Sequence, residues 1–378
     1  MAWIFYVIIE ALLFIIYERS ELLLKKFYQT LMEFNHPKDS KVRLILAGIC
    51  TLIINLIGYM TGIYEINKFG SLGIFTFLHY NPTDNQRVMK RLIFTGCFIV
   101  IGFTAGMLAS LNVWLVPVII SIIGFTSRLL YRIHSINKSG DIFVVLVTAI
   151  GTTVQVPFSE MIPLSLYIAL GVLLSITMGY IALKIEGVEQ QSIKVLTPLS
   201  VRIKQNPRAI IDSFFYAITL FFAGYINLAL GLGNYAWIVV SCSAILQGNT
   251  LSHIINRHFQ RIVGTSLGVL SAAFIISFPM NMLAKIILIA IFYVIVEYYI
   301  PRNYSIAVFF ITNMTMLQGT LLSTNDWQSL LQVRLISIII GSILGAISAM
   351  LQYRIYDYFS KDSIALKSSE IKLEVYDK

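Results

Sequence analysis

LIFTGCFIVIGFTAGMLASL, at residues 92–111, is a run of twenty residues without a charged side chain. A helix of this length matches the hydrocarbon core of a bilayer, which is about 30 Å thick. A second run, VWLVPVIISIIGFTSRLL, follows at residues 113–130 after a single asparagine. Together the two runs predict a pair of membrane-crossing helices joined by a tight turn.

The composition of the whole chain also indicates a membrane protein. Of its 378 residues, 57% are hydrophobic and 12% are charged, with a mean hydropathy of +0.79. Soluble domains carry roughly 25% charged residues, so a soluble globular protein is excluded. The net charge of +9 is explained by basic cytoplasmic loops and requires no nucleic-acid partner. Cys50, Cys97 and Cys242 lie in apolar runs without metal-ligand spacing, so we expect no disulfide, metal or other cofactor.

Apolar runs bounded by charge, proline or glycine predict about twelve spans in two groups of six. The first group lies near residues 43–63, 70–80, 92–111, 113–130, 142–158 and 162–184. The second group lies near residues 209–232, 235–248, 262–280, 284–300, 304–323 and 335–356. The predicted fold is therefore all-α, a polytopic membrane protein built from two six-helix transmembrane repeats.

Five segments follow from these spans. They are an N-terminal hydrophobic or interfacial segment with a cytoplasmic stretch (1–40), the first repeat (41–185), a cytoplasmic linker (186–208), the second repeat (209–356) and a cytoplasmic tail (357–378). The linker contains Pro198 and Pro207, which break a continuous helix. Residues 1–17 are apolar except for Glu10. The sequence leaves open whether they form an extra membrane-crossing helix or lie on the membrane surface.

Basic residues gather in alternate loops, and this pattern orients the predicted spans. They are Lys38, Lys41, Arg43, Arg87, Lys90, Arg91, Arg132, Lys138, Lys194, Arg202, Lys204, Arg208, Arg257, Arg261, Arg302, Arg354, Lys361, Lys367, Lys372 and Lys378. The intervening loops carry little beyond Lys68, Lys285 and Arg334. The positive-inside rule therefore places the linker and the C-terminus in the cytoplasm of a multi-pass cell-membrane protein.

An internal similarity supports the division into two repeats. RVMKRLIFT at residues 87–95 matches RHFQRIVGT at residues 257–265, with both arginines and the threonine offset by 170. The same offset relates Gly171 to Gly341 in the last span of each group. Because each repeat has an even number of spans, the repeats are predicted to be parallel, related by an axis along the membrane normal.

Three features of the second repeat resemble a known family. RIVGTSLG opens a span at residues 261–268, Arg302-Asn303-Tyr304 precedes the fifth span, and Arg334 lies seven residues before Gly341. This pattern is similar to the fusaric-acid-resistance-like (FUSC) family of the aromatic acid exporter superfamily, to which plant aluminium-activated malate channels are distantly similar. The resemblance is stronger in the second repeat than in the first.

The first repeat departs from this pattern. Phe94 and Phe98 replace Gly264 and Gly268, and Leu164 stands where the offset would place Arg334. Equivalent sites in the two repeats are therefore not expected.

The resemblance implies a function in transport. It implies export of organic anions, typically aromatic carboxylates, across the inner or plasma membrane, driven by the proton gradient. A passive anion channel of the malate-channel kind is an alternative, and a membrane scaffold that assists envelope assembly without transporting is a second one. The sequence contains no Walker-type loop and no catalytic constellation, so we expect no enzyme.

Arginines near span starts are the first candidates for anion binding. Arg257, Arg261 and Thr265 are spaced four residues apart and share one helical face, and Arg87 and Arg91 do the same in the first repeat. These residues could simply anchor the loops, with their guanidiniums reaching lipid phosphates. Alternatively, the guanidiniums and the free N–H groups of two helix N-termini face one another and collect anions in a cytoplasmic vestibule.

Four further residues are candidates for contacts with the substrate. Arg334 lies at the external end of its span, so its side chain must extend to the membrane surface, pair with a residue such as Asp326, or line a wet cavity on the exit side. Arg302 belongs to the family-like triplet. Trp237 could stack on an aromatic acid and Gln247 could hydrogen-bond to it, although interfacial tryptophan is common without such a role.

Two carboxylates are candidates for proton coupling. Asp212 lies in the first turn of a predicted helix, where a carboxylate can also serve as a cap. Glu297 lies near the end of an apolar run, five residues before Arg302, with which it could pair. The sequence does not identify the substrate, and it leaves open whether the chain forms a homodimer in the bilayer.

Overall fold

A computed structural model describes most of the chain. The described residues are 34–36, 40–81, 88–134, 136, 140–187, 199–206, 208–231, 236–248, 251–321 and 327–376. Every regular element within these ranges is a helix, which confirms the predicted all-α class. Residues 1–17, with Glu10, lie outside them. The two alternatives for that segment, a membrane-crossing helix and a helix on the membrane surface, therefore both stay open.

Within the described residues, eight helices are long and apolar enough to cross a bilayer. They are α2 (Lys41–Thr61), α4 (Val88–Ser110), α5 (Leu115–Ile133), α7 (Phe158–Glu186), α9 (Arg208–Ala229), α11 (Leu251–Ser277), α12 (Met282–Tyr299) and α14 (Trp327–Tyr376). Their exposed side chains include many large apolar residues, such as Ile101, Leu173 and Leu270, as expected of surfaces that face lipid. The polytopic membrane class is thus confirmed.

The other four predicted spans are short helical segments. They are η1, α3 and η2 in succession (Ile66–Gly70, Ser71–Gly73 and Ile74–His79), α6 (Ile142–Gly151), α10 (Ala236–Ile245) and α13 (Tyr304–Gly319). A ten-residue helix such as α10 is about 15 Å long, half of a bilayer core. The predicted span 142–158 ends early because Pro157, the N-cap of α7, begins a new helix. Twelve full spans are therefore not confirmed.

These short segments lie in the interior of the protein. Every residue of η2 is buried, and so is every residue of α10 except Trp237. A short helix that is apolar on all sides is typical of a protein core. Its composition nevertheless resembles that of a membrane span. The long helices surround these segments. Because both kinds of helix are apolar, the sequence alone could not separate membrane spans from interior helices.

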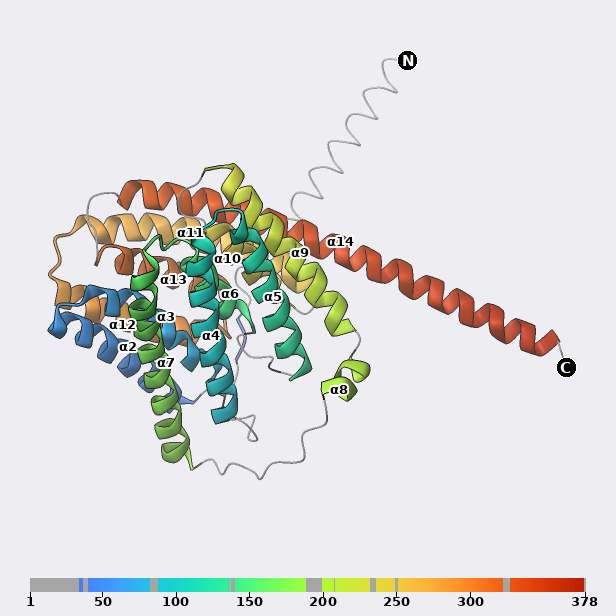
Figure 1. Ribbon diagram of the computed structural model, residues 1–378, viewed down its shortest axis with the longest axis horizontal. Helices are drawn as coiled ribbons and strands as arrows, with labels where there is room; N and C mark the ends of the chain where they lie inside the picture. The colour runs from blue at the N-terminus through green and yellow to red at the C-terminus, as the bar shows by residue number, and fades with distance from the viewer. Residues whose placement is uncertain are drawn as a thin grey trace, which may run out of the picture.

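The helices of the two parts of the chain pack in the same order. We refer to residues 40–187 as the first half and to residues 208–376 as the second half, and we count η1, α3 and η2 together as the second segment of the first half. In both halves the third helix packs on the fifth and the sixth: α4 on α6 and α7, and α11 on α13 and α14. Between the halves, α5 runs along α9 and α2 runs along α12; the first of these pairs is visible at the centre of Figure 1.

Two glycines related by the offset of 170 make equivalent close contacts. A Cβ added to Gly171 would lie 2.0 Å from the carbonyl oxygen of Gly70, and one added to Gly341 would lie 2.3 Å from that of Ile238. Neither position admits a side chain. In each half the sixth helix therefore approaches the second segment through glycine, as small residues allow at packed membrane helices.

The ends of the second half differ in detail from the predicted segments. The predicted linker includes a short helix, α8 (Leu199–Gln205). Helix α14 continues without a break from Trp327 to Tyr376, so the last predicted span and most of the predicted tail form one helix that projects from the bundle (Figure 1).

Candidate functional site

Arg261 is buried in the middle of α11 and binds two neighbouring segments. Its Nε donates to Oγ of Ser241 on α10 at 3.0 Å, and its Nη1 donates to Oη of Tyr304 at 2.8 Å. Tyr304 is positioned by Asn303, whose side chain caps α13 by accepting from the backbone N–H of Ile306 at 3.0 Å. The family-like triplet thus orients a tyrosine toward Arg261.

Arg334 is buried between α14 and α10, with only 2% of its surface exposed. Its guanidinium lies over the ring of Trp237, 3.7 Å from the ring centroid. Its Nε and Nη1 are buried and have no hydrogen-bond partner. Arg261 is close enough to repel it electrostatically. The structure therefore brings together two arginines that the sequence assigned to opposite ends of the transport path.

Arg257 lies one turn before Arg261 on α11. Its guanidinium lies over the ring of Tyr304, 4.1 Å from the centroid, so this tyrosine contacts both arginines. The expectation that the two arginines stand at a helix N-terminus is wrong, because α11 begins at Leu251, ten residues before Arg261. The start of α11 is about 15 Å along the helix axis from the Cα of Arg261 by helical rise.

Six of the fourteen buried side-chain polar atoms that lack a hydrogen-bond partner in the described part of the chain lie on α11 and α14. They are Arg257 Nε, His258 Nδ1, Thr265 Oγ1, Arg334 Nε, Arg334 Nη1 and Ser337 Oγ. Leaving such an atom unsatisfied costs about 1–3 kcal/mol. A group of them on two packed helices therefore indicates a place that accommodates a polar ligand.

The charges at this place are of one sign. We call Arg257, Arg261 and Arg334 the cationic cluster. Among the residues that the structure describes, no carboxylate forms an ion pair with any of the three. Asp326, a predicted partner of Arg334, lies outside the described residues. Two buried arginines and a half-buried one favour an anion, and arginine suits planar carboxylates because its donors form a rigid fork.

The candidates from the first half lie elsewhere. Arg91 is buried in the first turn of α4, where it interacts electrostatically with His79 and Tyr131. Tyr131 donates to Oγ1 of Thr95 at 2.9 Å. Within the described residues α4 does not pack along α11, so Arg91 and the cationic cluster occupy separate surroundings. Arg87 is not described, and a vestibule of four facing guanidiniums stays a prediction.

Two more candidates also lie apart from the cluster. Arg302 donates from Nη1 to the carbonyl oxygen of Tyr298 at 2.6 Å and stacks on its ring at 3.8 Å. Gln247, just after α10, donates to Oδ1 of Asp141 at 3.2 Å, whereas Trp237 lies at the other end of that helix. The structure thus separates Trp237 from Gln247.

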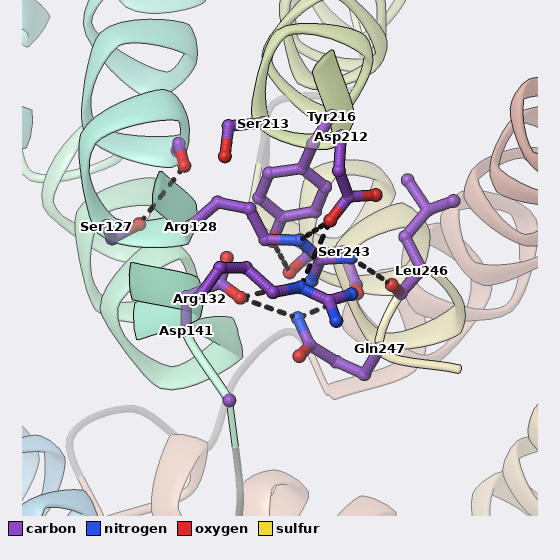
Figure 2. Close-up of polar contacts among 12 residues, drawn as sticks. Ser127, Arg128, Arg132, Asp141, Asp212, Ser213, Tyr216, Ser243, Leu246 and Gln247 are labelled. Atoms are coloured by element: carbon purple, nitrogen blue, oxygen red, sulfur yellow. Dashed lines mark hydrogen bonds and ion pairs between the residues drawn. The ribbon is translucent and has the colours of Figure 1, made fainter. Parts of the chain in front are cut away.

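A second buried charge cluster lies where α5 meets α9 (Figure 2). Arg128 pairs with Oδ1 of Asp141 at 3.1 Å and with Oδ2 of Asp212 at 3.3 Å, and it donates to the carbonyl oxygen of Leu246 at 2.6 Å. Its guanidinium also lies 4.4 Å from the ring centroid of Tyr216. Here the positive charge of Arg128 is balanced by the carboxylates of Asp141 and Asp212. We therefore interpret this cluster as a structural contact between helices.

Both proton-coupling candidates are in ion pairs. Asp212 is bound by Arg128, by Nε of Arg132 at 3.1 Å and by the side-chain amide of Gln352 at 2.9 Å. Glu297, on α12, pairs with Nη1 of Arg43 at 3.7 Å. In both cases the partner arginine comes from the other half of the chain.

The role of Arg128 was not predicted from the sequence. It stands inside the predicted span 113–130, and an ionisable residue within a span is by default a candidate for a specific partner. That signal could have identified the residue. Its partners could not be identified, because Asp212 is 84 positions and Leu246 118 positions away.

Comparison with known proteins places the cationic cluster in a recognisable segment. Residues 218–348 match the model of a family described as fusaric acid resistance protein-like. This confirms the resemblance to the fusaric-acid-resistance-like family. The matched residues run from α9 into α14 and include all three arginines of the cluster.

A curated relative also matches the chain. It is described as "Uncharacterized membrane protein YvaC" of Bacillus subtilis (strain 168) and is 31% identical over 140 residues. The match covers 37% of this chain and 22% of the relative, so the chain spans only a small part of that protein's length. No solved structure matches the chain significantly.

Proposed function

We propose that this chain is a membrane transporter that exports organic anions and holds the anion at the cationic cluster. One observation carries the proposal: the three arginines lie on helices of the fusaric-acid-resistance-like segment without a paired carboxylate among the described residues. A bound carboxylate would offset part of the positive charge and accept hydrogen bonds from Nε and Nη1 of Arg334.

Aromatic carboxylates are the substrate class that we propose. The rings of Trp237 and Tyr304 stand beside the guanidiniums of the cluster. They provide apolar faces next to the cations, a combination suited to an anion that carries a ring. Thr265 supplies a buried hydroxyl one turn beyond Arg261.

Proton coupling through Asp212 or Glu297 would require an ion pair to break. Protonation of either carboxylate would leave a buried guanidinium without its counter-charge, which is costly. This observation favours the second candidate function, a passive anion channel, which needs no titrating carboxylate.

We further propose that the two halves are parallel six-helix repeats, with the linker and the C-terminus in the cytoplasm. The common order of long and short helices and the equivalent glycine contacts support this arrangement. The basic loops of the sequence support the orientation.

The test is flux of labelled aromatic and aliphatic carboxylates in proteoliposomes, with and without a pH gradient. We expect Arg261→Ala to abolish flux while the protein still inserts, and Lys90→Ala, at an exposed position on α4, to leave it unchanged. Flux that ignores the pH gradient would select the channel. Unchanged flux in Arg261→Ala would remove the cluster from the mechanism, and no flux of any anion in the unmodified protein would favour the scaffold.

A further inference from the structure

Two reciprocal interfaces join the halves of the chain. In one, the fourth helix of the first half, α5, runs along the first helix of the second half, α9. In the other, α12 of the second half runs along α2 of the first half, again fourth helix against first. We call these the α5–α9 seam and the α2–α12 seam.

Each seam contains an ion pair whose arginine is buried. At the α2–α12 seam, Nη1 of Arg43 lies 3.7 Å from Oε2 of Glu297, and the two side chains are only 2% and 3% exposed. Nη2 of Arg43 also approaches the carbonyl oxygen of Glu297, at 3.5 Å. At the α5–α9 seam, Arg128 and Arg132 share Oδ2 of Asp212. Both seams are therefore held by charge as well as by apolar packing.

The polarity of these pairs is the same throughout. In all three ion pairs between described residues of the two halves, the first half supplies the arginine and the second half the carboxylate. The helix that carries each charge nevertheless differs between the seams. The fourth helix carries the arginine at the α5–α9 seam and the carboxylate at the α2–α12 seam. The sign of the charge therefore depends on which half a helix belongs to. It does not depend on whether the helix is the first or the fourth of that half.

This polarity matters because the helix order does not distinguish the halves. Both halves present a first and a fourth helix to their partner, so two copies of the same half could offer similar surfaces to one another. Two first halves would then bury Arg43 against Arg128, and two second halves would bury Asp212 against Glu297. Like charges in a low-dielectric interior repel strongly, which is how a specific interface rejects a wrong partner.

We propose that the sign of the charge is a pairing code: the arginine-bearing faces of α2 and α5 accept the carboxylate-bearing faces of α12 and α9 and reject a second copy of their own half. The partner of each half is thus the opposite half, within the chain or from another copy of it. The code acts at the seams and is independent of the transported anion.

The experiment uses the full chain with a protease site inserted between Gln190 and Gln191, cut after purification. We expect the cut halves of the unmodified protein to co-elute in size-exclusion chromatography. Arg43→Glu and Glu297→Arg should each release a large fraction of the halves. The double variant Arg43→Glu/Glu297→Arg should retain most of the pairing, because it restores opposite charges. Lys90→Glu makes the same change of charge at an exposed position on α4 and should release nothing.

A second measurement separates the code from simple loss of stability. Two copies whose first halves carry different tags are co-expressed and cut, and one tag is captured. Arg43→Glu should raise first-half self-capture several-fold, because the reversed side chain can meet Arg128 of another copy, whereas Arg43→Gln should release halves without raising self-capture. The proposal is overturned if the double variant pairs no better than the worse single one, or if Arg43→Glu leaves self-capture at the level of Arg43→Gln.

Discussion

Replacing Arg128 by methionine tests how much a fully compensated buried arginine contributes to the fold. Its side chain is 5% exposed and pairs with Asp141 and Asp212 at 3.1 and 3.3 Å. Methionine has a similar length but no charge, so the substitution removes the cation and leaves Asp141 buried without it. The carbonyl oxygen of Leu246 also loses a donor at 2.6 Å.

The magnitude follows from burial. Removing one partner of a buried ion pair costs about 3–5 kcal/mol. Arg132 provides a matched comparison, because it contacts the same oxygen of Asp212 at 3.1 Å but is 35% exposed. Arg132 is 35% exposed and Asp212 is 20% exposed, and for this partly solvated pair we expect a contribution of at most about 1 kcal/mol. At about 2 °C per kcal/mol for a large domain, Arg128→Met should lower Tm by about 6–10 °C and Arg132→Met by no more than about 2 °C.

Thermal unfolding of both variants in one detergent, followed by tryptophan fluorescence, measures the difference. The double variant Arg128→Met/Asp141→Asn should regain part of the lost Tm, because the stranded carboxylate is removed together with its cation. Equal losses for Arg128→Met and Arg132→Met would refute the reasoning, since Arg128 is more deeply buried and also binds Asp141 and the carbonyl oxygen of Leu246.

Three further predictions concern the packing and the cationic cluster. Gly341→Leu should abolish monodisperse protein in size-exclusion chromatography because its Cβ would lie 2.3 Å from a carbonyl oxygen of α10, while Gly319→Ala, with nothing within 4 Å, should not. Trp237→Ala should raise the Kd of an aromatic carboxylate about thirtyfold in a binding assay, because a desolvated cation–π contact contributes about 2 kcal/mol. Arg261→Lys should weaken the same binding without reducing membrane insertion, since lysine lacks the fork that reaches Ser241 and Tyr304.

The sequence predicted the long helices well because length and apolarity are the properties that a bilayer selects. It could not separate spans from the short interior helices, since a protein core and a lipid core both select apolar side chains. The run at 235–248 contains the ten-residue α10, which is buried by protein.

The candidate site was predicted in its residues but not in its arrangement. The spacing of Arg257 and Arg261 fixed their common helical face, and that relation depends only on α-helical geometry. The contact between Arg334 and Trp237 depends on α14 packing against α10. Residues that are distant in the chain meet there for reasons of tertiary packing, which no local spacing encodes.

The distribution of arginine partners distinguishes structural arginines from candidates for binding. In the first half, Arg43 and Arg128 lie at seams and each meets a carboxylate of the second half. In the second half, the buried Arg261 and Arg334 meet hydroxyl groups, a tryptophan ring and one another. A protein gains nothing in stability from burying two cations together. The cluster is therefore best explained by a ligand of opposite charge, and the seams by the fold itself.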